Sequence, residues 1–365
     1  MRLKNIELKN FRNYDEFLFS FEKQKTLIIG ENAQGKTNIL EGIYYLSVLD
    51  SIRIKKDSEL IKFGEDFSKI RANVVKSGVD VELEVLIQPP KNKIIKVNGL
   101  KKTKHSDFQR VLSVVIFSTA DLMLLRGEPA IRRKWLDNAI CQIYPIYADK
   151  LAKYNKIRLQ KANLLSNYPV NLDMLEVFNA QLATVGANII FLRNKFLNEL
   201  NKIANIKHKK IAQNEELEAK YENEFLAGGD ISPKEIESAL SAKLSELKDD
   251  EIRRAQCLVG PHRDDVSYLI NGVDAKKFAS QGQQRTIVLA LKLAELDIIK
   301  EKNEEYPILL LDDVLAELDI LRQNYLLSSI EDNIQTVITS TDTKAFSDEF
   351  LADIDVIKIQ AGKMV

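Results

Sequence analysis

The segment that most constrains the fold is GENAQGKT at residues 30–37, because it matches the pattern G-x-x-x-x-G-K-[ST] at every fixed position. The apolar run TLIIG leads directly into it, and the helical pattern NILEGIYYLSVL follows it. A short apolar run that ends in glycine before a helical pattern is typical of a buried strand that turns into a helix. The sequence therefore predicts a strand, loop and helix that hold nucleotide phosphates within an α/β fold.

The residue types in this loop explain how it would hold a phosphate. Gly30 and Gly35 let the backbone curl so that successive N–H groups face the β-phosphate, and the following helix adds its positive end. We expect Lys36 to contact the β- and γ-phosphates as a catalytic cation, and the Thr37 hydroxyl to bind Mg²⁺. The alternative is a chance match in a glycine turn, which the flanking patterns argue against. The nucleotide contacts predicted for the loop are Gly30, Glu31, Asn32, Ala33, Gln34, Gly35, Lys36 and Thr37.

A second motif, ILLLDD at residues 308–313, supplies the acids that such a site needs. Carboxylates directly after a core strand are unusual unless they face a cation. We assign Asp312 to the Mg²⁺ ligands and Asp313 to catalysis, where it would orient or deprotonate the attacking water. The alternative is an exposed strand end with two solvated acids. Because this motif lies in the last third of the chain, the first and last thirds must meet, unlike in compact kinases and small GTPases.

The pattern between the two motifs divides the chain into three parts. Strand-like runs at 2–9, 17–21 and 68–97 precede residue 126, with a predicted hairpin turn at Asn98-Gly99. From there to about residue 250 the pattern is helical with no convincing strand, and strands return afterwards. We therefore expect an α/β domain built from residues 1–125 and 251–365, with a helical lobe at 126–250 inserted between them.

The segment ASQGQQRT at residues 279–286 predicts a second helix start that suits an anion. Ser280 is a plausible N-cap, and Gly282 allows close approach of the backbone. The simplest alternative is an ordinary cap on a core helix. If two copies of the chain pair head to tail, this loop in one copy would contact the γ-phosphate held by the other.

At this point the chain resembles a known family. Ser280-Gln281-Gly282-Gln283-Gln284 resembles the signature motif of ABC-type ATPases in the form found in the RecF family, which is related to SMC and double-strand-break-repair ATPase heads. Further matches occur in the family's order from near the start of the chain to near its end. The helical segment at about 140–250 resembles the family only in its general helical pattern. These matches are ELKNFRNY at 7–14, FSTADLMLLRGEPAIRRKWLD at 117–137, VGPHRDD at 259–265, PILLLDDVLAELD at 307–319 and ITST at 338–341.

The resemblance implies an ABC-type P-loop ATPase head, with mixed sheets around the P-loop helix, and an ATP-dependent homodimer with two composite sites. Ser280, as a catalytic residue, and Gly282 would contact the γ-phosphate across the dimer. Gln283 and Arg12 would also lie near the nucleotide. Other positions carried over from the family are Asp319 at the dimer interface, Ala316 where the motif usually has serine, Thr339 where many relatives have histidine, and Asp121 as a loose match to a glutamine-loop residue.

The activity implied by the resemblance is DNA repair and recombination. ATP would drive dimerisation and DNA binding at gaps or junctions, and slow, DNA-dependent ATP hydrolysis would reverse it. The output would be loading of recombinase, with RecR as a partner and RecO as a further candidate. Two alternatives remain open: a nucleotide-gated DNA-binding module with negligible turnover, and the ATPase subunit of a transporter.

The charge balance places any DNA contact in a local patch. Lys plus Arg and Asp plus Glu are both 53, so the net charge gives no overall attraction to nucleic acid. The segment KNKIIKVNGLKKTKH at 91–105 concentrates lysines around the predicted hairpin, where they would bind DNA phosphates without reading sequence. The alternative is a solvated edge hairpin whose lysines deter aggregation. The predicted DNA contacts are Lys93, Lys96, Lys101, Lys102, Lys104 and Arg53. His262 and Arg263 are left without an assigned role.

The remaining features concern the cellular compartment. The N-terminal segment MRLKNIELKNF lacks the apolar core of a signal peptide, and we expect no apolar window long enough for a membrane span. Cys141 and Cys257 have no metal-ligand spacing, so two reduced thiols are expected, with a disulfide as the alternative. These features predict a cytoplasmic protein without a membrane partner.

Overall fold

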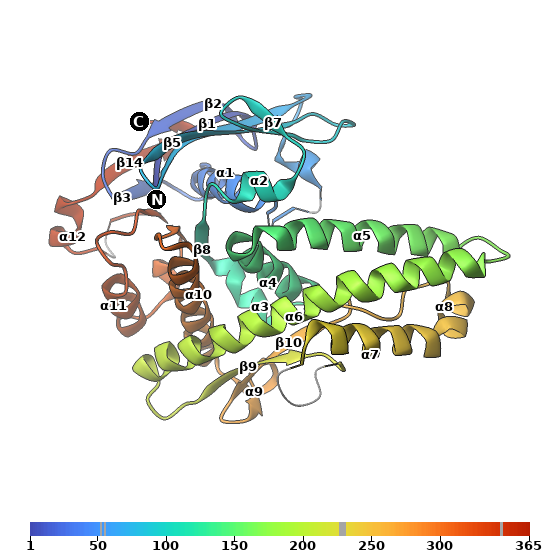
Figure 1. Cartoon of the computed structure of the whole chain (residues 1–365). Helices are drawn as coiled ribbons and strands as arrows, with labels where there is room; N and C mark the ends of the chain where they lie inside the picture. Colours follow the sequence, from blue (N-terminus) through green and yellow to red (C-terminus); the bar gives the residue numbers. More distant parts are fainter. Residues whose placement is uncertain (52, 55, 226–230, 344–345) are drawn as a thin grey trace.

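The computed structural model describes residues 1–51, 53–54, 56–225, 231–343 and 346–365. Its strands form three sheets, and helices lie between and below them (Figure 1).

The first sheet is antiparallel and forms the upper layer in Figure 1. Along β4 buried and half-buried residues alternate, because successive side chains point to opposite faces. Asn98 and Gly99 both have positive φ between paired Val97 and Leu100, which confirms the predicted hairpin. In spatial order the strands are β2 (Tyr14–Ser20), β1 (Arg2–Phe11), β4 (Ser68–Lys76), β5 (Val79–Ile87), β6 (Ile94–Val97) and β7 (Leu100–Lys102).

The second sheet joins the two ends of the chain. Its strands pair in parallel except for β15, which pairs antiparallel with β14, so the sheet is mixed as expected. The strand before the phosphate loop, β3, pairs with β13 on one side and β14 on the other, so the first and last thirds of the chain do meet. In spatial order the strands are β15 (Lys363–Met364), β14 (Asp355–Gln360), β3 (Lys25–Ile29), β13 (Thr336–Ser340), β12 (Ile308–Asp312) and β8 (Val114–Ser118).

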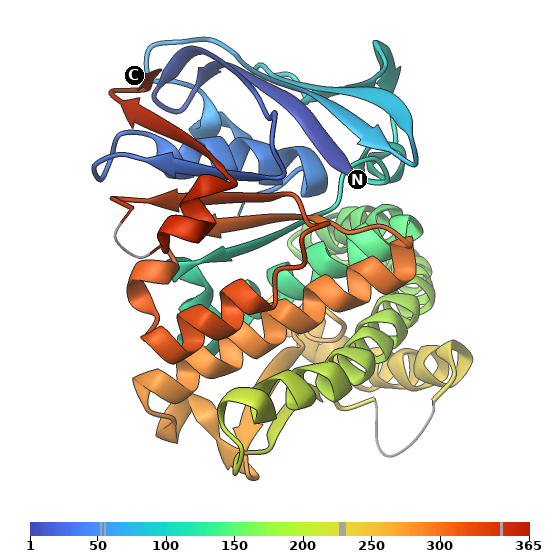
Figure 2. The same cartoon turned by 90° about the vertical axis from the view of Figure 1, so that its left-hand side faces the viewer.

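The helix after the phosphate loop, α1 (Lys36–Val48), lies between these two sheets (Figure 2). Ile28 and Leu310 belong to the core shared with α1 and the first sheet, whereas their neighbours Leu27 and Leu309 belong to the core on the opposite face. A parallel sheet covered on both faces needs apolar residues at every position of its central strands. This explains the uninterrupted runs TLII and ILLL.

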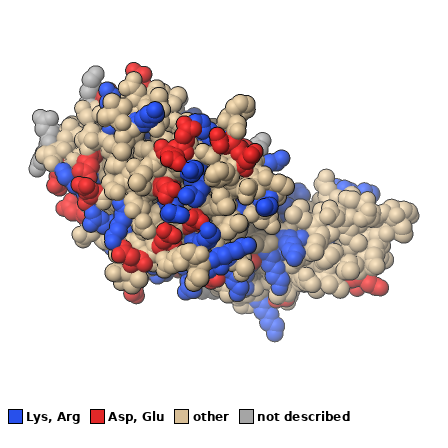
Figure 3. Space-filling model, turned by 90° about the horizontal axis from the view of Figure 1, so that it is seen from above, with Lys and Arg blue, Asp and Glu red and all other residues tan. Residues whose placement is uncertain are grey.

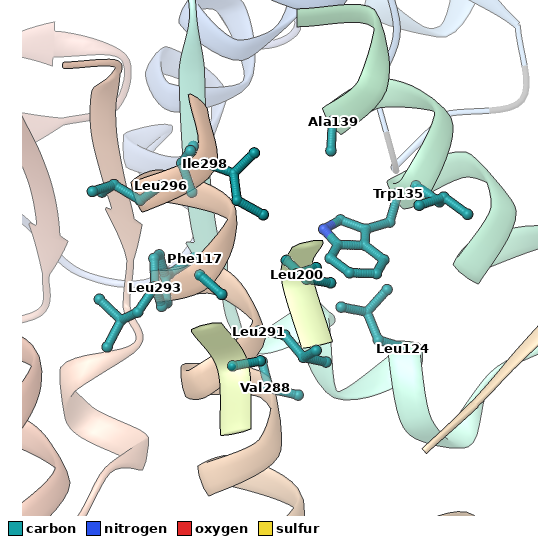
Figure 4. Close-up of a cluster of buried hydrophobic side chains, with 14 of the residues drawn as sticks. Phe117, Leu124, Trp135, Ala139, Leu200, Val288, Leu291, Leu293, Leu296 and Ile298 are labelled. Atoms are coloured by element: carbon teal, nitrogen blue, oxygen red, sulfur yellow. The ribbon is translucent and has the colours of Figure 1, made fainter. Parts of the chain in front are cut away.

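The second core contains the helix that follows the signature segment, α10 (Gln281–Asn303). Figure 4 shows Trp135 and Leu124 on one side of this core, facing Leu291 and Val288 of α10. The indole N–H of Trp135 donates to buried Glu295 of α10 at 2.8 Å, so the one polar atom of this large side chain is satisfied.

The lobe is mainly helical but also contributes a strand. β9 (Leu217–Glu222) pairs with β10 (Asp265–Ile270), which pairs in turn with β11 (Val273–Asp274). The expectation of no strand between 126 and 250 is therefore wrong, because LEAKYE buries only Leu217 and Ala219 among charged residues and gives a weak signal. The three-part division of the chain stays a prediction, and the β9–β10 ladder crosses its boundary at 250. The lobe helices are α4 (Pro129–Ile143), α5 (Pro145–Leu165), α6 (Leu172–Ile211), α7 (Pro233–Glu246) and α8 (Lys248–Arg254).

The long helix α6 corrects one further expectation. It contains an 18-residue window with a mean hydropathy of 1.4, so by length and composition alone it passes as a membrane span. In the structure 44% of that window is buried, and α6 packs against α5, α7 and α10. We therefore interpret α6 as a core helix of the lobe.

The remaining short elements connect these layers. They are η1 (Asp57–Leu60), α2 (His105–Gln109), η2 (Thr119–Leu122), α3 (Met123–Arg126), α9 (Ala275–Phe278), η3 (Leu315–Glu317), α11 (Ile320–Ser328) and α12 (Asp348–Ala352). Cys141 and Cys257 are free, in agreement with the sequence prediction.

Candidate nucleotide-binding site

Two glycines fix the path of the phosphate loop between β3 and α1. A Cβ added to Gly30 would lie 2.4 Å from the Ile359 carbonyl oxygen, which leaves no room for a side chain. Gly35 is the N-cap of α1 and has a φ of 112°, which L-residues with side chains rarely adopt. No side chain caps α1, so the N–H groups at the start of this helix remain available to an anion.

The loop is held from outside by two neighbouring turns. The Tyr14 hydroxyl donates to the Gly35 carbonyl at 3.1 Å, and the Asn13 amide donates to the Gln34 carbonyl at 3.2 Å. From the other side, the Gly362 N–H donates to the same Gln34 carbonyl at 3.1 Å, and the Gln34 side chain accepts from the Ala361 N–H. Sequence reasoning placed Gln34 at the nucleotide, whereas its side chain anchors the loop to the C-terminal turn. It also missed Asn13 and Tyr14, although both lie in the family match ELKNFRNY.

Lys36 is buried inside the loop. Its ammonium donates to the carbonyls of Gly30 at 2.7 Å and Glu31 at 3.0 Å, and the residue is 4% exposed. Within the described ranges no carboxylate forms an ion pair with it. Since two carbonyls leave its positive charge uncompensated, this ammonium is suited to bind an anion.

The predicted metal ligands meet across the sheet. The Thr37 hydroxyl donates to Oδ1 of Asp312 at 2.8 Å, and the Thr339 hydroxyl donates to the same oxygen at 2.9 Å. Burial raises the pKa of Asp312, while the two hydroxyl hydrogen bonds act in the opposite direction. A hydroxyl and a carboxylate are hard oxygen ligands of the kind that Mg²⁺ takes together with substrate phosphates. Among the described residues no group of three or more His, Cys, Asp or Glu is placed to hold a metal ion.

Asp313 follows in a left-handed conformation, with a φ of 52°. Its N–H donates to the Thr339 hydroxyl at 3.0 Å, so Thr339 holds both aspartates of the motif. Asp313 lines a cavity of about 250 Å³ together with Thr37 and Asp312. The structure thus brings the loop, the metal ligands and the predicted catalytic acid to one place, and it gives a role to Thr339, where many relatives have histidine.

A buried acid on α1 organises the rim of this cavity. Glu41 accepts two hydrogen bonds from Arg12, at 2.7 and 2.8 Å, and one each from Ser51 and Arg53. Arg12 therefore lies beside the cavity through its contact with Glu41 but does not line it, and its predicted contact with the nucleotide stays a prediction. Arg53 lines the same cavity. Arg53 therefore lies at the candidate nucleotide site, whereas the sequence suggested a DNA contact for it.

The signature segment forms the cap of α10. The Ser280 hydroxyl accepts from the Gln283 N–H at 3.2 Å, and the Gln283 side chain accepts from the Ser280 N–H at 2.8 Å. Gln283 also donates to Glu215 at 2.8 Å. Across the described part of the chain, no hydrogen bond or ion pair joins residues 280–286 to residues 30–37. Figure 1 shows α9, just before Ser280, at the opposite side of the molecule from α1.

Asp319 connects the signature helix to the segment after the two aspartates. It caps α11 by accepting from the Arg322 N–H at 2.9 Å, and it pairs with the Arg322 guanidinium. That guanidinium also donates to Thr286 of α10 at 2.8 Å and lies 3.5 Å from where a Gly282 Cβ would be. The two motifs that the resemblance places at a dimer interface therefore form one unit in this chain. Ala316 lies within η3, and nothing in the structure gives it a polar role.

Comparison with known proteins agrees with this geometry. A family model described as the RecF/RecN/SMC N terminal domain matches residues 2–363. The DNA replication and repair protein RecF of Bacillus subtilis (strain 168) is 40% identical over 370 residues, which cover 100% of both chains. The chain belongs to the RecF family. RecF of Bacillus cereus (strain G9842) is also 40% identical, over 99% of this chain and 98% of that protein.

Solved structures support the same family and fold. One described as the recombination mediator protein RecF-ATP in the RecFOR pathway has a TM-score of 0.91 and 36% identity, and covers 100% of this chain and 96% of that chain. An Smc head bound to the C-terminal winged-helix domain of ScpA has a TM-score of 0.53 at 15% identity, covering 100% and 97%, and shows the fold alone. The predicted ABC-type ATPase head is confirmed.

The lysines predicted to contact DNA in this RecF family member differ in their surroundings. Lys93 is 17% exposed, pairs with Asp57 at 3.1 Å and donates to the Leu49 carbonyl at 2.7 Å, and Lys96 pairs with Glu84 at 2.6 Å. The side-chain ammonium groups of Lys101, Lys102 and Lys104 form no ion pair or hydrogen bond with any residue that the structure describes. In the view over the first sheet, acidic and basic side chains are mixed over the broad body, and Lys and Arg gather near the base of the narrow arm (Figure 3).

His262 has a structural place. Its ring contacts the Tyr154 hydroxyl at 2.8 Å and the Cys257 carbonyl at 3.1 Å, and burial lowers the pKa of His262 to about 4. It is therefore neutral at pH 7. The two acids that follow Arg263 pair with other arginines: Asp264 contacts Arg193, and Asp265 contacts Arg132.

Asp121 is buried at the end of β8 and caps η2. It accepts from the Ser118 N–H at 2.6 Å and pairs with Lys292 of α10 at 3.5 Å. Burial raises the pKa of Asp121. It links β8 to the signature helix and does not line the nucleotide cavity.

Proposed function

We propose that this chain is a RecF-type DNA replication and repair ATPase in which ATP binding closes a homodimer on DNA and slow, DNA-stimulated hydrolysis opens it. One observation carries the proposal. Thr37 of the phosphate loop, Asp312 and Asp313 line one cavity, whereas α9, just before Ser280, lies at the opposite side of the molecule from α1 (Figure 1). A second copy is needed to complete the site.

Each residue of this half-site has a distinct task. The N–H groups before α1 and the Lys36 ammonium bind the β- and γ-phosphates, and the Thr37 and Asp312 oxygens hold Mg²⁺, which neutralises phosphate charge when it is bound. Asp313, placed in the cavity by its left-handed backbone, orients or deprotonates the attacking water. Ser280 and the start of α10 from the second copy contact the γ-phosphate and stabilise the charge that develops there.

Exposed apolar side chains flank the motifs proposed to meet the second copy. Phe278 is 72% exposed just before Ser280, and Ile320 and Leu321 are 74% and 60% exposed just after Asp319. Burial of such side chains favours association. A shift from mostly monomer to mostly dimer needs about 5 kcal/mol of differential binding. Two γ-phosphates, each contacted from the partner copy, are an adequate source.

We propose that DNA binds through its backbone, with recombinase loading as the output and RecR, with RecO as a further candidate, as partner proteins. The relatives described as RecF in the RecFOR pathway support this assignment. Lys101, Lys102 and Lys104 are the lysines with unpaired ammonium groups at the hairpin. The likeness to these relatives, and an N-terminal segment without the apolar core of a signal peptide, also support a cytoplasmic location.

The DNA contribution of these three lysines is testable through salt dependence. Replacing all three with glutamine is expected to weaken duplex binding at every sequence and to reduce the slope of log affinity against log salt by about 3, roughly one per phosphate contact. Lys96→Gln is the matched control, because Glu84 already neutralises Lys96. An unchanged slope in the triple variant would remove the hairpin from the DNA surface.

The dimer is tested by sedimentation of the chain with ATP, with ADP and without nucleotide, each with Mg²⁺. We expect dimer with ATP and monomer in the other two conditions. A monomer in all three would overturn the composite site. If dimers form but no phosphate is released in the presence of DNA, the alternative of a nucleotide-gated DNA-binding module with negligible turnover is favoured.

A further inference from the structure

A second cavity, of about 280 Å³, lies where α4, α5 and α6 meet the segment before β10. It shares no lining residue with the nucleotide cavity. Its charged lining consists of four cations and two carboxylates, with neutral His262 beside them, which gives an excess of two positive charges. The six charged residues are Arg133, Lys134, Arg158, Arg193, Asp50 and Asp137.

The two carboxylates are already matched to two of the cations. Asp137 binds the Arg193 guanidinium with two hydrogen bonds of 2.9 Å, and Asp50 pairs with Lys134 at 2.9 Å. These pairs leave the excess charge on the remaining two arginines. The cavity therefore has a local positive field although the chain as a whole is neutral.

The two remaining guanidiniums lack a carboxylate partner within the described part of the chain. Arg133 donates to the Asp264 backbone carbonyl at 2.6 Å, and the Asp264 carboxylate is occupied by Tyr221, Asn223 and Arg193. For Arg158, Nε is buried and has no hydrogen-bond partner. A buried guanidinium N–H without an acceptor costs free energy, and an anion in the cavity would supply that acceptor.

We propose that this cavity binds a phosphate group, held by the guanidiniums of Arg133 and Arg158. Two planar guanidiniums that each offer several N–H donors match the oxygens of phosphate. Because neither guanidinium has a carboxylate partner among the described residues, the pair favours an anion over a metal cation. The group comes from one of two sources with the same chemistry, free orthophosphate or a DNA phosphate.

The cavity is a close neighbour of the nucleotide site. Lys134 donates to the Ser51 carbonyl at 2.7 Å, and Ser51 donates to Glu41 at the rim of the nucleotide cavity. On the same wall, the Asn138 amide donates to the Tyr44 hydroxyl at 3.3 Å. The phosphate released by ATP hydrolysis would thus be produced next to this cavity. Binding of phosphate in the cavity nevertheless does not depend on the proposed ATPase activity.

The test measures orthophosphate binding by the full chain at constant ionic strength, with Mg²⁺ and saturating ADP so that the phosphate loop is filled. Calorimetry and thermal unfolding are expected to show saturable binding in the wild type and in Lys36→Met. In Arg158→Met the affinity is expected to fall about tenfold or more. The matched control is Lys156→Met, which removes an exposed positive charge from the same helix and is expected to change nothing. Equal binding in Arg158→Met and Lys156→Met, or no binding in the wild type, overturns the proposal.

A second measurement separates the two sources. If a DNA phosphate occupies the cavity, Arg158→Met weakens duplex binding in fluorescence anisotropy, and orthophosphate competes with DNA in the wild type only. If free phosphate is the ligand, DNA affinity is the same in Arg158→Met and Lys156→Met while orthophosphate binding is lost. ATP affinity measured on the same variants keeps this test distinct from that of the ATPase proposal, since both variants are expected to bind ATP normally.

Discussion

The phosphate loop and the signature segment are both turns that open onto a helix, yet their helix starts are satisfied differently. At the start of α1, Gly35 adopts a left-handed conformation and no side chain caps the helix. At the start of α10, Ser280 and Gln283 form a reciprocal capping box. The first N–H groups of α1 are left for a ligand, whereas those of α10 are partly satisfied by the chain itself.

The two regions also differ in support. The loop follows the strand β3, which lies between two other strands, and turns from both ends of the chain hold it. Ser280 is exposed. One helix start is therefore open to a ligand that a single chain could bind, whereas the other is capped within the chain and exposed, as its proposed contact with a second copy requires.

The largest expected effect tests whether the loop side carries the chemistry. Asp313→Asn should lower ATP turnover by about 10²–10⁴-fold, because it removes the group that orients or deprotonates water. ATP binding should persist and ATP-dependent dimers should live longer, as measured by phosphate release and sedimentation. Asp332→Asn, at an exposed carboxylate, is the control. Normal turnover in Asp313→Asn would assign catalysis elsewhere.

The next effect tests the buried ammonium. Lys36→Met should weaken ATP binding about 100-fold, since charged hydrogen bonds to two phosphates are lost. Folding should be little changed, because the removed charge has no carboxylate partner among the described residues. Fluorescent ATP titration and thermal unfolding measure the two quantities. Retained affinity would contradict the assignment of the loop as the phosphate site.

Two substitutions of Ser280 separate capping from recognition. Ser280→Ala should cost about 1 kcal/mol of stability through loss of the cap. Ser280→Asp retains a capping acceptor and should fold normally, but its charge would repel the γ-phosphate of a second copy. We expect monomeric Ser280→Asp to bind ATP like the wild type and to fail to dimerise. Normal dimers of this variant in sedimentation would show that Ser280 acts only as a cap.

The smallest effect tests the outside support of the loop. Tyr14→Phe removes the hydrogen bond to the Gly35 carbonyl and should cost about 0.5–1.5 kcal/mol of stability. If this hydrogen bond holds the phosphate loop in the conformation that binds ATP, the free energy of ATP binding should weaken by a similar amount. Phe19→Tyr on the same strand adds a hydroxyl to a partly buried ring and controls for general effects of this strand. Unchanged affinity with reduced stability would assign Tyr14 to folding alone.

Much of this arrangement was predictable from local patterns. A glycine loop between an apolar strand and a helix is typical of a phosphate-binding loop. Two aspartates directly after the core strand ILLL indicate a nearby cation, because buried carboxylates need a partner. Features whose partners lie far along the chain were harder to predict. The Gln34 side chain accepts from the Ala361 N–H, and β9 is a strand because β10 pairs with it. Such partners leave no periodic signal near the residue itself.

The pairing of β3 also determines when, during synthesis of the chain, the phosphate loop can take its place in the sheet. Both of its neighbours, β13 and β14, come from the last part of the chain. While the ribosome is still making the lobe, the phosphate loop therefore has neither its sheet nor Asp312. A truncated copy that lacks the C-terminal strands would keep the glycine motif but would lose both neighbours of β3. We therefore expect stable nucleotide binding only once the whole polypeptide has been made.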